Sequence, residues 1–204
     1  MFVQVIQGHI TDADQMHAAL DRWERELAPG ADGWIDSTAG VTDNDEFIAV
    51  VRFETAQAAQ RNSDRPEQDR WWRQTSELFT DAPMFQESDD VIADGDHPER
   101  AGFVQIIEGR GSDPDRAREL MADDSPEWAE FRPDVIGSVA CQHEGGKYTM
   151  AMYFTSEREA REGEKKEMPP ALKEQMAEMD ALSVGEPSFY DLHQPWIQTA
   201  HHHN

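Results

Sequence analysis

The sequence predicts an α+β fold in which one β-α-β-β-α-β unit is built twice along the chain. Residues 2–8 (FVQVIQG) recur as residues 103–109 (FVQIIEG) with five identities in seven positions, and such self-similarity indicates a repeated structural unit. The two copies are separated by 103 − 2 = 101 positions, about half of the 204 residues. The same order of strand and helix patterns follows each copy, so two domains are expected.

The first strand and helix are expected from residues 2–8 and from the segment that begins at Thr11. Both alternating rows of residues 2–8 are mostly apolar, which is typical of a strand covered on both faces. Thr11 and Asp12 precede a helical pattern as an N-cap would. Apolar residues then recur at spacings of four, three and four: Met16, Leu20, Trp23 and Leu27. Pro29 and Gly30 end this helix.

Two more strands, a helical region and a last strand complete the first unit. Residues 34–41 and 46–53 have strand patterns and are joined by a polar turn. A helical pattern runs from residue 55 past Trp72, with a break expected at residues 62–66. Residues 82–88 form the last short strand. This order is that of a ferredoxin-like unit.

The second half repeats the order. Ile35, Ser37 and Ala39 recur as Ile136, Ser138 and Ala140, still 101 positions later. Near the end of each half the offset becomes 104, since Pro83 pairs with Pro187, so three residues are inserted in the second helical region. We therefore expect ferredoxin-like domains at 1–88 and 102–197, a polar linker at 89–101 and a tail at 198–204.

A single unit of this kind covers only one face of its sheet with helices, so the other face needs a partner. Two copies in one chain can place their open faces together. We therefore expect the two sheets to pack face to face as a pseudo-dimer within the chain, with further self-association left open.

Composition narrows the classes of partner. The chain carries 42 acidic against 18 basic residues, a net charge of −24, which repels phosphate backbones and anionic lipid. Nucleic acid and membrane surfaces are therefore not expected as partners. Cys141 is the only cysteine, which excludes an intrachain disulfide and a cysteine zinc site. No signal-peptide pattern or membrane-length apolar run occurs, so a cytoplasmic location is expected.

Trp71 and Trp72 are the most conspicuous candidates for a binding site. Adjacent helical residues point about 100° apart, so one indole can face the sheet while the other lines a cleft. The pair is either an aromatic wall for a flat ligand or ordinary core packing. At the unshifted offset their counterparts are Leu172 and Lys173, so a site built on the pair is expected in one half only.

Four polar residues complete the set of candidates. Gln4 lies mid-strand and either contacts a ligand or fixes strand register with Gln105. Arg52 interrupts an apolar strand and either binds a phenolate or carboxylate, or is an exposed strand-end residue stretched over apolar surface. His9 follows the first strand as a candidate base or a surface histidine, and Asn62 either contacts a substrate oxygen or forms a turn. No metal-ligand spacing occurs, so no metal site is expected.

The tandem pattern resembles the dimeric α/β-barrel superfamily, and within it the antibiotic-biosynthesis-monooxygenase-like (ABM) domains. The resemblance is carried by residues 2–8 and 103–109, by the strand at 46–53, and by the segment from Asn62 to Trp72. It implies an intramolecular dimeric α/β barrel made of the two ferredoxin-like units.

The resemblance also implies a function. Members of this superfamily include cofactor-independent oxygenases of polycyclic phenols, haem-degrading enzymes and domains without known activity. The haem-degrading members use a histidine on the second helix, but residues 67–72 and 164–168 contain none, so no cofactor is expected. The resemblance therefore implies a cofactor-independent monooxygenase with a small aromatic substrate, with His9 as base, Arg52 or Asn62 as stabiliser, and Gln4, Trp71 and Trp72 in contact with the substrate. The alternative is a non-catalytic small-molecule-binding or structural module.

Overall fold

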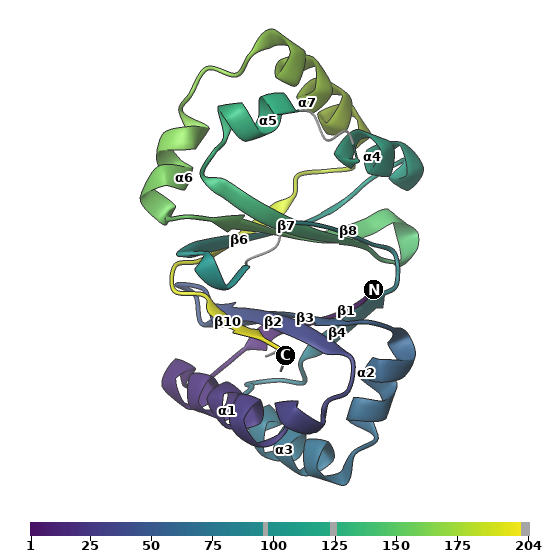
Figure 1. Ribbon diagram of the computed structural model, residues 1–204, viewed down its shortest axis with the longest axis vertical. Coiled ribbons are helices and arrows are strands. Elements are labelled where there is room, and N and C mark those ends of the chain that lie inside the picture. The colour runs from purple at the N-terminus through teal and green to yellow at the C-terminus, as the bar shows by residue number, and fades with distance from the viewer. Residues whose placement is uncertain (96–97, 123–125, 201–204) are drawn as a thin grey trace. The chain divides into compact units, whose positions relative to one another are not determined.

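The computed structural model describes residues 1–95, 98–122 and 126–200, and the chain divides into two compact units. Unit 1 comprises Met1–Val91 together with Gln194–Asn204, and unit 2 comprises Ile92–His193. Each unit contains one five-stranded antiparallel sheet with helices (Figure 1).

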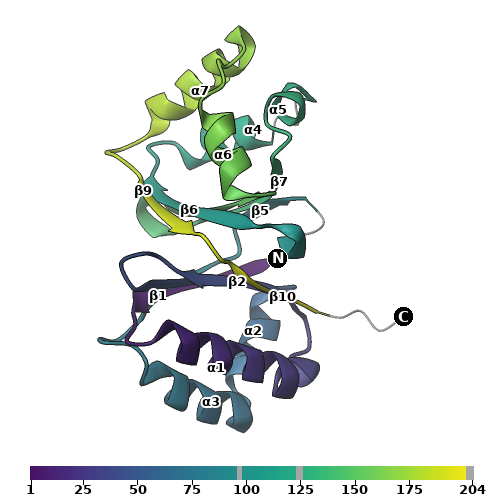
Figure 2. The same ribbon diagram turned by 90° about the vertical axis from the view of Figure 1, so that its left-hand side faces the viewer.

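Unit 1 has the strand order β10-β2-β3-β1-β4. Its elements are β1 (Phe2–His9), α1 (Ala13–Glu26), a short 3₁₀ turn (Ala28–Gly30), β2 (Trp34–Val41), β3 (Glu46–Phe53), α2 (Ala56–Ser63), α3 (Pro66–Ser76), β4 (Met84–Ser88) and β10 (Trp196–Thr199). The helices lie on one face of the sheet, with α1 and α3 side by side (Figure 2). This face, between sheet and helices, holds the candidate site described below.

Local sequence signals account for the helix boundaries in unit 1. Asp12 caps α1 by accepting a hydrogen bond from the Gln15 backbone N–H, and Thr55 caps α2 in the same way. Pro66 occupies the first turn of α3, where its missing N–H costs no helical hydrogen bond. The break predicted at residues 62–66 is therefore confirmed, since it separates α2 from α3.

Unit 2 has the strand order β5-β7-β8-β6-β9. Its elements are β5 (Val91–Asp94), 3₁₀ turns (Pro98–Arg100 and Glu144–Gly146), β6 (Phe103–Arg110), α4 (Pro114–Met121), α5 (Pro126–Phe131), β7 (Val135–Gln142), β8 (Lys147–Phe154), α6 (Glu157–Glu164), α7 (Pro170–Leu182) and β9 (Ser188–Leu192). The pairing of β6 with β8, from Phe103 opposite Phe154, repeats that of β1 with β3, from Phe2 opposite Phe53. The α+β prediction of two tandem β-α-β-β-α-β units is confirmed, and the face-to-face packing of their sheets stays a prediction.

The edge strands β5 and β10 depart from the expected order. The segment 89–101, expected to be a linker, contains β5, and the tail expected from residue 198 begins inside β10. β10 follows the second repeat in the sequence but pairs with β2 of unit 1, and β5 follows the first repeat but joins β7 of unit 2. A strand of four residues is too short to show a reliable alternation, and only the tertiary pairing partner defines it. Residues 201–204 of the expected tail lie outside the described part of the chain.

The described helices include none with the length and apolar character needed to span a membrane.

Candidate functional site

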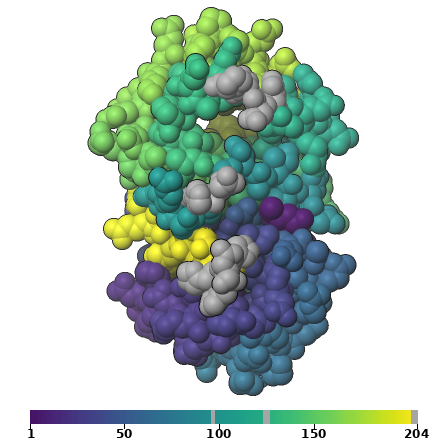
Figure 3. Space-filling view, viewed as in Figure 1, coloured from purple at the N-terminus to yellow at the C-terminus, as the bar shows by residue number. Residues whose placement is uncertain are grey.

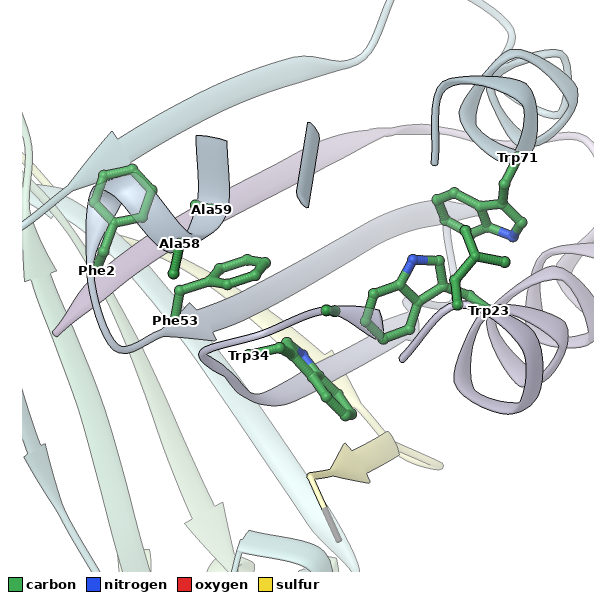
Figure 4. Close-up of a cluster of buried hydrophobic side chains, with 9 residues drawn as sticks. Phe2, Trp23, Trp34, Phe53, Ala58, Ala59 and Trp71 are labelled. Carbon is green, nitrogen blue, oxygen red and sulfur yellow. The ribbon is translucent and has the colours of Figure 1, made fainter. Parts of the chain in front are cut away.

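The core of unit 1 is rich in aromatic side chains, which gather in two clusters of the described residues. One contains Trp23, Trp34, Phe53 and Trp71, and Figure 4 shows Trp23 of α1 beside Trp71 of α3. The other contains Met16, Phe47 and Phe79, among others. Three partly buried residues pack against both clusters: Leu20, Val51 and Trp72.

A cavity lies where these two clusters meet, between the sheet and the helices. Its volume is about 80 Å³, counted as the space open to the centre of a water-sized sphere, where one water needs about 10–15 Å³. The wall is mostly aromatic and aliphatic, as is usual for small-molecule sites. It is formed by Gln4, Ile6, Met16, Leu20, Trp23, Ser37, Ala39, Phe47, Ala49, Val51, Phe53, Asn62, Gln68, Trp71, Trp72, Thr75, Phe79, Trp196 and Gln198.

The buried indole N–H groups around the cavity are bonded to protein atoms. Trp23 Nε1 donates to Gln68 Oε1 at 2.6 Å, and Trp71 Nε1 donates to the Ala19 carbonyl oxygen at 2.9 Å. Because these polar atoms are satisfied, the indoles present apolar ring surface to the cavity and are held at fixed orientations. Trp72 is partly buried and meets the rings of Trp71, Phe79 and Phe85 at centroid distances of 6.1, 6.1 and 5.3 Å.

Asn62 is held at the cavity wall by Arg65. The Asn62 Oδ1 atom accepts a hydrogen bond from Arg65 Nη1 at 2.9 Å, and the same guanidinium donates to the Leu27 carbonyl oxygen and to Glu67. The pKa of Glu67 is lowered by its own backbone N–H at the start of α3 and then by Arg65. Since the oxygen of the Asn62 amide is engaged, its NH₂ group is the part able to donate to a ligand.

The exchanged strand β10 forms one wall of the cavity. Trp196 pairs with Ala39 of β2 and Gln198 pairs with Ser37, and all four residues line the cavity. The Trp196 ring stacks on His17 of α1, with centroids 4.5 Å apart and planes 4° apart. In Figure 3 this C-terminal segment, in yellow, lies beside the purple N-terminal part of unit 1. The cavity therefore depends on residues from both ends of the sequence.

The structure brings together four of the six candidates and separates two. Gln4, Asn62, Trp71 and Trp72 line the cavity, and Gln4 Nε2 donates to Glu87 of β4. His9 is exposed at the end of β1.

Arg52 lies on the opposite face of β3 from Val51 and Phe53, because successive strand residues alternate. It is buried there and forms an ion pair with Asp36. The alternative of an exposed Arg52 is therefore wrong. The functional roles predicted for these residues stay predictions.

The cavity wall carries uncharged polar groups only. Among the described residues that form it, none is Asp, Glu, His, Lys, Arg, Tyr or Cys. A buried ion without a partner is unstable in such surroundings. The geometry thus favours an uncharged ligand and offers no side-chain base.

Sequence reasoning missed several residues of the wall. Thr75 lies four positions after Trp71, so helical periodicity alone places both on one face of α3. Trp23 and Met16 were recognised only as a helical apolar stripe. Trp196 and Gln198 had no usable signal, because their neighbours in the fold are remote in the sequence.

Unit 2 differs at the equivalent positions, and one predicted correspondence is wrong. The Trp71 indole bonds to the Ala19 carbonyl, and Gln175 Nε2 bonds to the Leu120 carbonyl in the same way. The counterparts of Trp71 and Trp72 are therefore Gln175 and Met176 at the offset of 104, not Leu172 and Lys173. The reason is that the three extra residues precede α7, in its connection to α6.

Unit 2 also contains a polar cluster of Glu157, Asp191 and His193, whose ligand-type atoms lie within 4.8 Å of one another. His193 Nδ1 lies 2.8 Å from Glu157 Oε2, and Arg161 is paired with Asp191 and with Glu157. A guanidinium already satisfies these carboxylates, so an ion-pair network accounts for the cluster without a metal.

Solved structures share this architecture. A candidate monooxygenase from Lactobacillus acidophilus NCFM has a TM-score of 0.75 at 11% identity, over 97% of this chain and 95% of that one. An anthrone oxidase-like protein has a TM-score of 0.67 at 12% identity, over 98% and 93%. An uncharacterised ferredoxin-fold protein from Listeria monocytogenes, related to antibiotic biosynthesis monooxygenases, has a TM-score of 0.52 at 11% identity, over 94% of each chain.

The sequence itself matches no protein-family model and no curated protein. At such low identities the structural similarity establishes the fold and leaves activity open. The chain has the tandem ferredoxin-like fold of ABM-like proteins, as the resemblance implied.

Proposed function

We propose that unit 1 binds a small, flat aromatic molecule in the cavity between its sheet and helices α1 and α3. The observation that carries this proposal is the cavity wall itself. Trp71, Trp72 and Trp196 present ring surface, and a few amide and hydroxyl groups lie between them. Flat aromatic surfaces stack on indoles, and the sparse polar groups fix orientation.

Tryptophan fluorescence tests this proposal directly. Five of the six tryptophans lie in unit 1 (Trp23, Trp34, Trp71, Trp72 and Trp196), so the signal reports mainly on that unit. Titration with naphthols, quinols and anthrone is expected to give saturable quenching. Trp72→Ala is expected to weaken binding about tenfold or more, as loss of an aromatic contact of roughly 1.5 kcal/mol does. Met176→Ala changes the equivalent position of unit 2 and is the matched control. Equal affinity in both variants would exclude a site at Trp72.

A second candidate function is cofactor-independent oxygenation of the bound aromatic. It is favoured by the Asn62 amide at the cavity wall and by the fold shared with an anthrone oxidase-like protein. In this chemistry an acidic CH₂ group of the substrate loses a proton to solvent, and the carbanion donates an electron to O₂. The substrate radical and superoxide then combine to a peroxide anion, which takes back a proton from solvent to become a hydroperoxide. Loss of water from the hydroperoxide leaves C=O, so that CH₂ and O₂ become C=O and H₂O. The Asn62 NH₂ group would stabilise the enolate oxygen by a hydrogen bond.

Oxygen consumption separates the two candidates. If the chain is an oxygenase, anthrone is expected to be consumed with one O₂ per molecule. The Asn62→Ala variant is then expected to lose most of this rate, by about 10²-fold, while it retains binding. Saturable binding without oxygen uptake above that of buffer would leave unit 1 as a binding module.

A further inference from the structure

Thr75 is a buried polar residue at the cavity wall of unit 1. It lies on α3, four residues after Trp71, and is only 3% exposed. Within the described part of the chain its hydroxyl oxygen has no hydrogen-bond partner. Buried polar groups are nearly always hydrogen-bonded, so each exception calls for an explanation.

Three other polar side chains of this wall are bonded to protein atoms, and the Asn62 amide has only its NH₂ group left to donate. Gln68 accepts from Trp23, Gln4 donates to Glu87, and Ser37 Oγ accepts from Trp34 Nε1 at 3.0 Å. Thr75 stands out because its hydroxyl, which can both donate and accept, has no hydrogen-bond partner among the described residues. An unsatisfied hydroxyl is a cost to folding that a ligand can relieve.

We propose that Thr75 is the hydrogen-bond anchor of the cavity and selects uncharged aromatic ligands that carry a hydroxyl or carbonyl group. The inference rests on the proposed function, because it names the ligand class of that same site. Selection against ions follows from the wall, whose described residues include no cationic or anionic side chain. An anionic ligand would lose its hydration there without gaining a countercharge.

The anchor also accounts for a difference between the units. The position equivalent to Thr75 is Met179, 104 residues later, and Met176 replaces Trp72. Unit 2 thus lacks both the hydroxyl and the indole at this place. The selectivity for a polar aromatic is accordingly a property of unit 1.

Calorimetric titration of the full chain with three naphthalene compounds at neutral pH tests the inference. Naphthalene has no polar group, 2-naphthol has one uncharged hydroxyl, and 2-naphthalenesulfonate is an anion. Wild type is expected to bind 2-naphthol about 3- to 10-fold more tightly than naphthalene, the effect of one neutral hydrogen bond. The sulfonate is expected not to bind.

Thr75→Val removes the hydroxyl at nearly constant shape. It is expected to abolish the preference for 2-naphthol and to leave the affinity for naphthalene unchanged. Thr75→Ser keeps the hydroxyl and should keep the preference. Ser76→Ala removes the neighbouring hydroxyl, which bonds to the Arg73 carbonyl and does not line the cavity, and should behave as wild type.

The failures are distinguishable. Binding of no compound by wild type would overturn both the aromatic site and the anchor. Binding of 2-naphthol with its preference intact in Thr75→Val, or equally tight binding of the sulfonate, would overturn the anchor alone. Without ligand, Thr75→Val is expected to melt at the same or a higher temperature. A lower melting temperature would reveal a protein partner for the hydroxyl and overturn the inference.

Discussion

The two units share a strand register but differ in what fills the space beneath the sheet. On the helix-facing side, β3 carries Phe47, Ala49 and Val51, whereas β8 carries Tyr148, Met150 and Met152 at the positions 101 residues later. The helices follow the same trend, with Met176 in place of Trp72. Rigid indoles surround a cavity in unit 1, whereas in unit 2 flexible methionine side chains take the places of Ala49, Val51 and Trp72.

This difference is physically meaningful because the two residue types pack in different ways. Indoles are stiff, and two of those in unit 1 are held by their N–H bonds, so the space between them persists. Methionine has three rotatable bonds and adapts to irregular gaps. A duplicated fold can therefore keep a binding cavity in one copy while the other copy serves packing.

The largest predicted effect concerns Trp71 and its counterpart Gln175. Trp71→Ala removes a buried indole and its bond to Ala19, and is expected to lower the free energy of unfolding by about 3–5 kcal/mol. Gln175→Ala removes two part-buried hydrogen bonds, one donated to the Leu120 carbonyl and one accepted from Trp128 Nε1, and is expected to lower the free energy of unfolding by about 1–3 kcal/mol. Urea unfolding followed by fluorescence and by circular dichroism gives both values. Equal losses of unfolding free energy in the two variants would show that Trp71 stabilises unit 1 no more than Gln175 stabilises unit 2.

Acid stability is expected to distinguish the units through Asp134. Unit 2 has Arg132 and Asp134 where unit 1 has Ala31 and Gly33. Burial alone would raise the pKa of Asp134, but the hydrogen bonds and charge of Arg132 outweigh it and hold the pKa below 3.8. A lowered folded pKa contributes stability that is present above the unfolded value of 3.8 and is lost as pH falls through the folded pKa.

The variant Asp134→Asn is therefore expected to lower the free energy of unfolding of unit 2 by about 1–3 kcal/mol at pH 7, and by progressively less below pH 3.8. Hydrogen exchange of unit 2 amides, measured against pH, provides the readout, with unit 1 amides as the internal control. A cost that does not change with pH would assign the effect to packing and not to the ion pair.

The exchanged strand offers a smaller and more local test. Trp196→Ala is expected to lower the free energy of unfolding by about 1–2 kcal/mol, because the ring is only partly buried. It is also expected to weaken the binding of aromatic ligands, because it widens the cavity. Ile197→Ala alters the next residue, whose side chain points to the opposite face of β10 from Trp196. It is the matched control for ligand binding. Unchanged affinity in Trp196→Ala would remove β10 from the site.

Much of the fold was accessible from the sequence, and the site only in part. The repeat, the bounds of β2 and β3, and the break before Pro66 were all predicted, because local patterns determine them. Trp71 and Trp72 were visible as a pair. Trp196 was not, since strand exchange is a tertiary event with no local pattern. The charge pairing of Arg52 with Asp36 was missed because it joins neighbouring strands across sixteen residues.

The last prediction converts one unit toward the other with little change in stability. The double variant Trp72→Met with Thr75→Met installs in unit 1 the residues of unit 2 at Met176 and Met179. The volume lost when Trp72 becomes Met is largely recovered when Thr75 becomes Met. The free energy of unfolding is therefore expected to change by less than about 1.5 kcal/mol. Aromatic binding is nevertheless expected to disappear, because both the ring surface and the anchoring hydroxyl are gone.

Fluorescence cannot follow this variant through Trp72, so calorimetry with 2-naphthol is the measurement. The reverse exchange in unit 2, Met176→Trp with Met179→Thr, is the control. It shows whether two substitutions at these positions of the equivalent helix α7 alter binding by themselves. Retained binding in the unit 1 variant would mean that its affinity resides in the β10 and α1 walls. Loss of binding with stability preserved would show that two side chains of α3 separate a binding unit from a structural one.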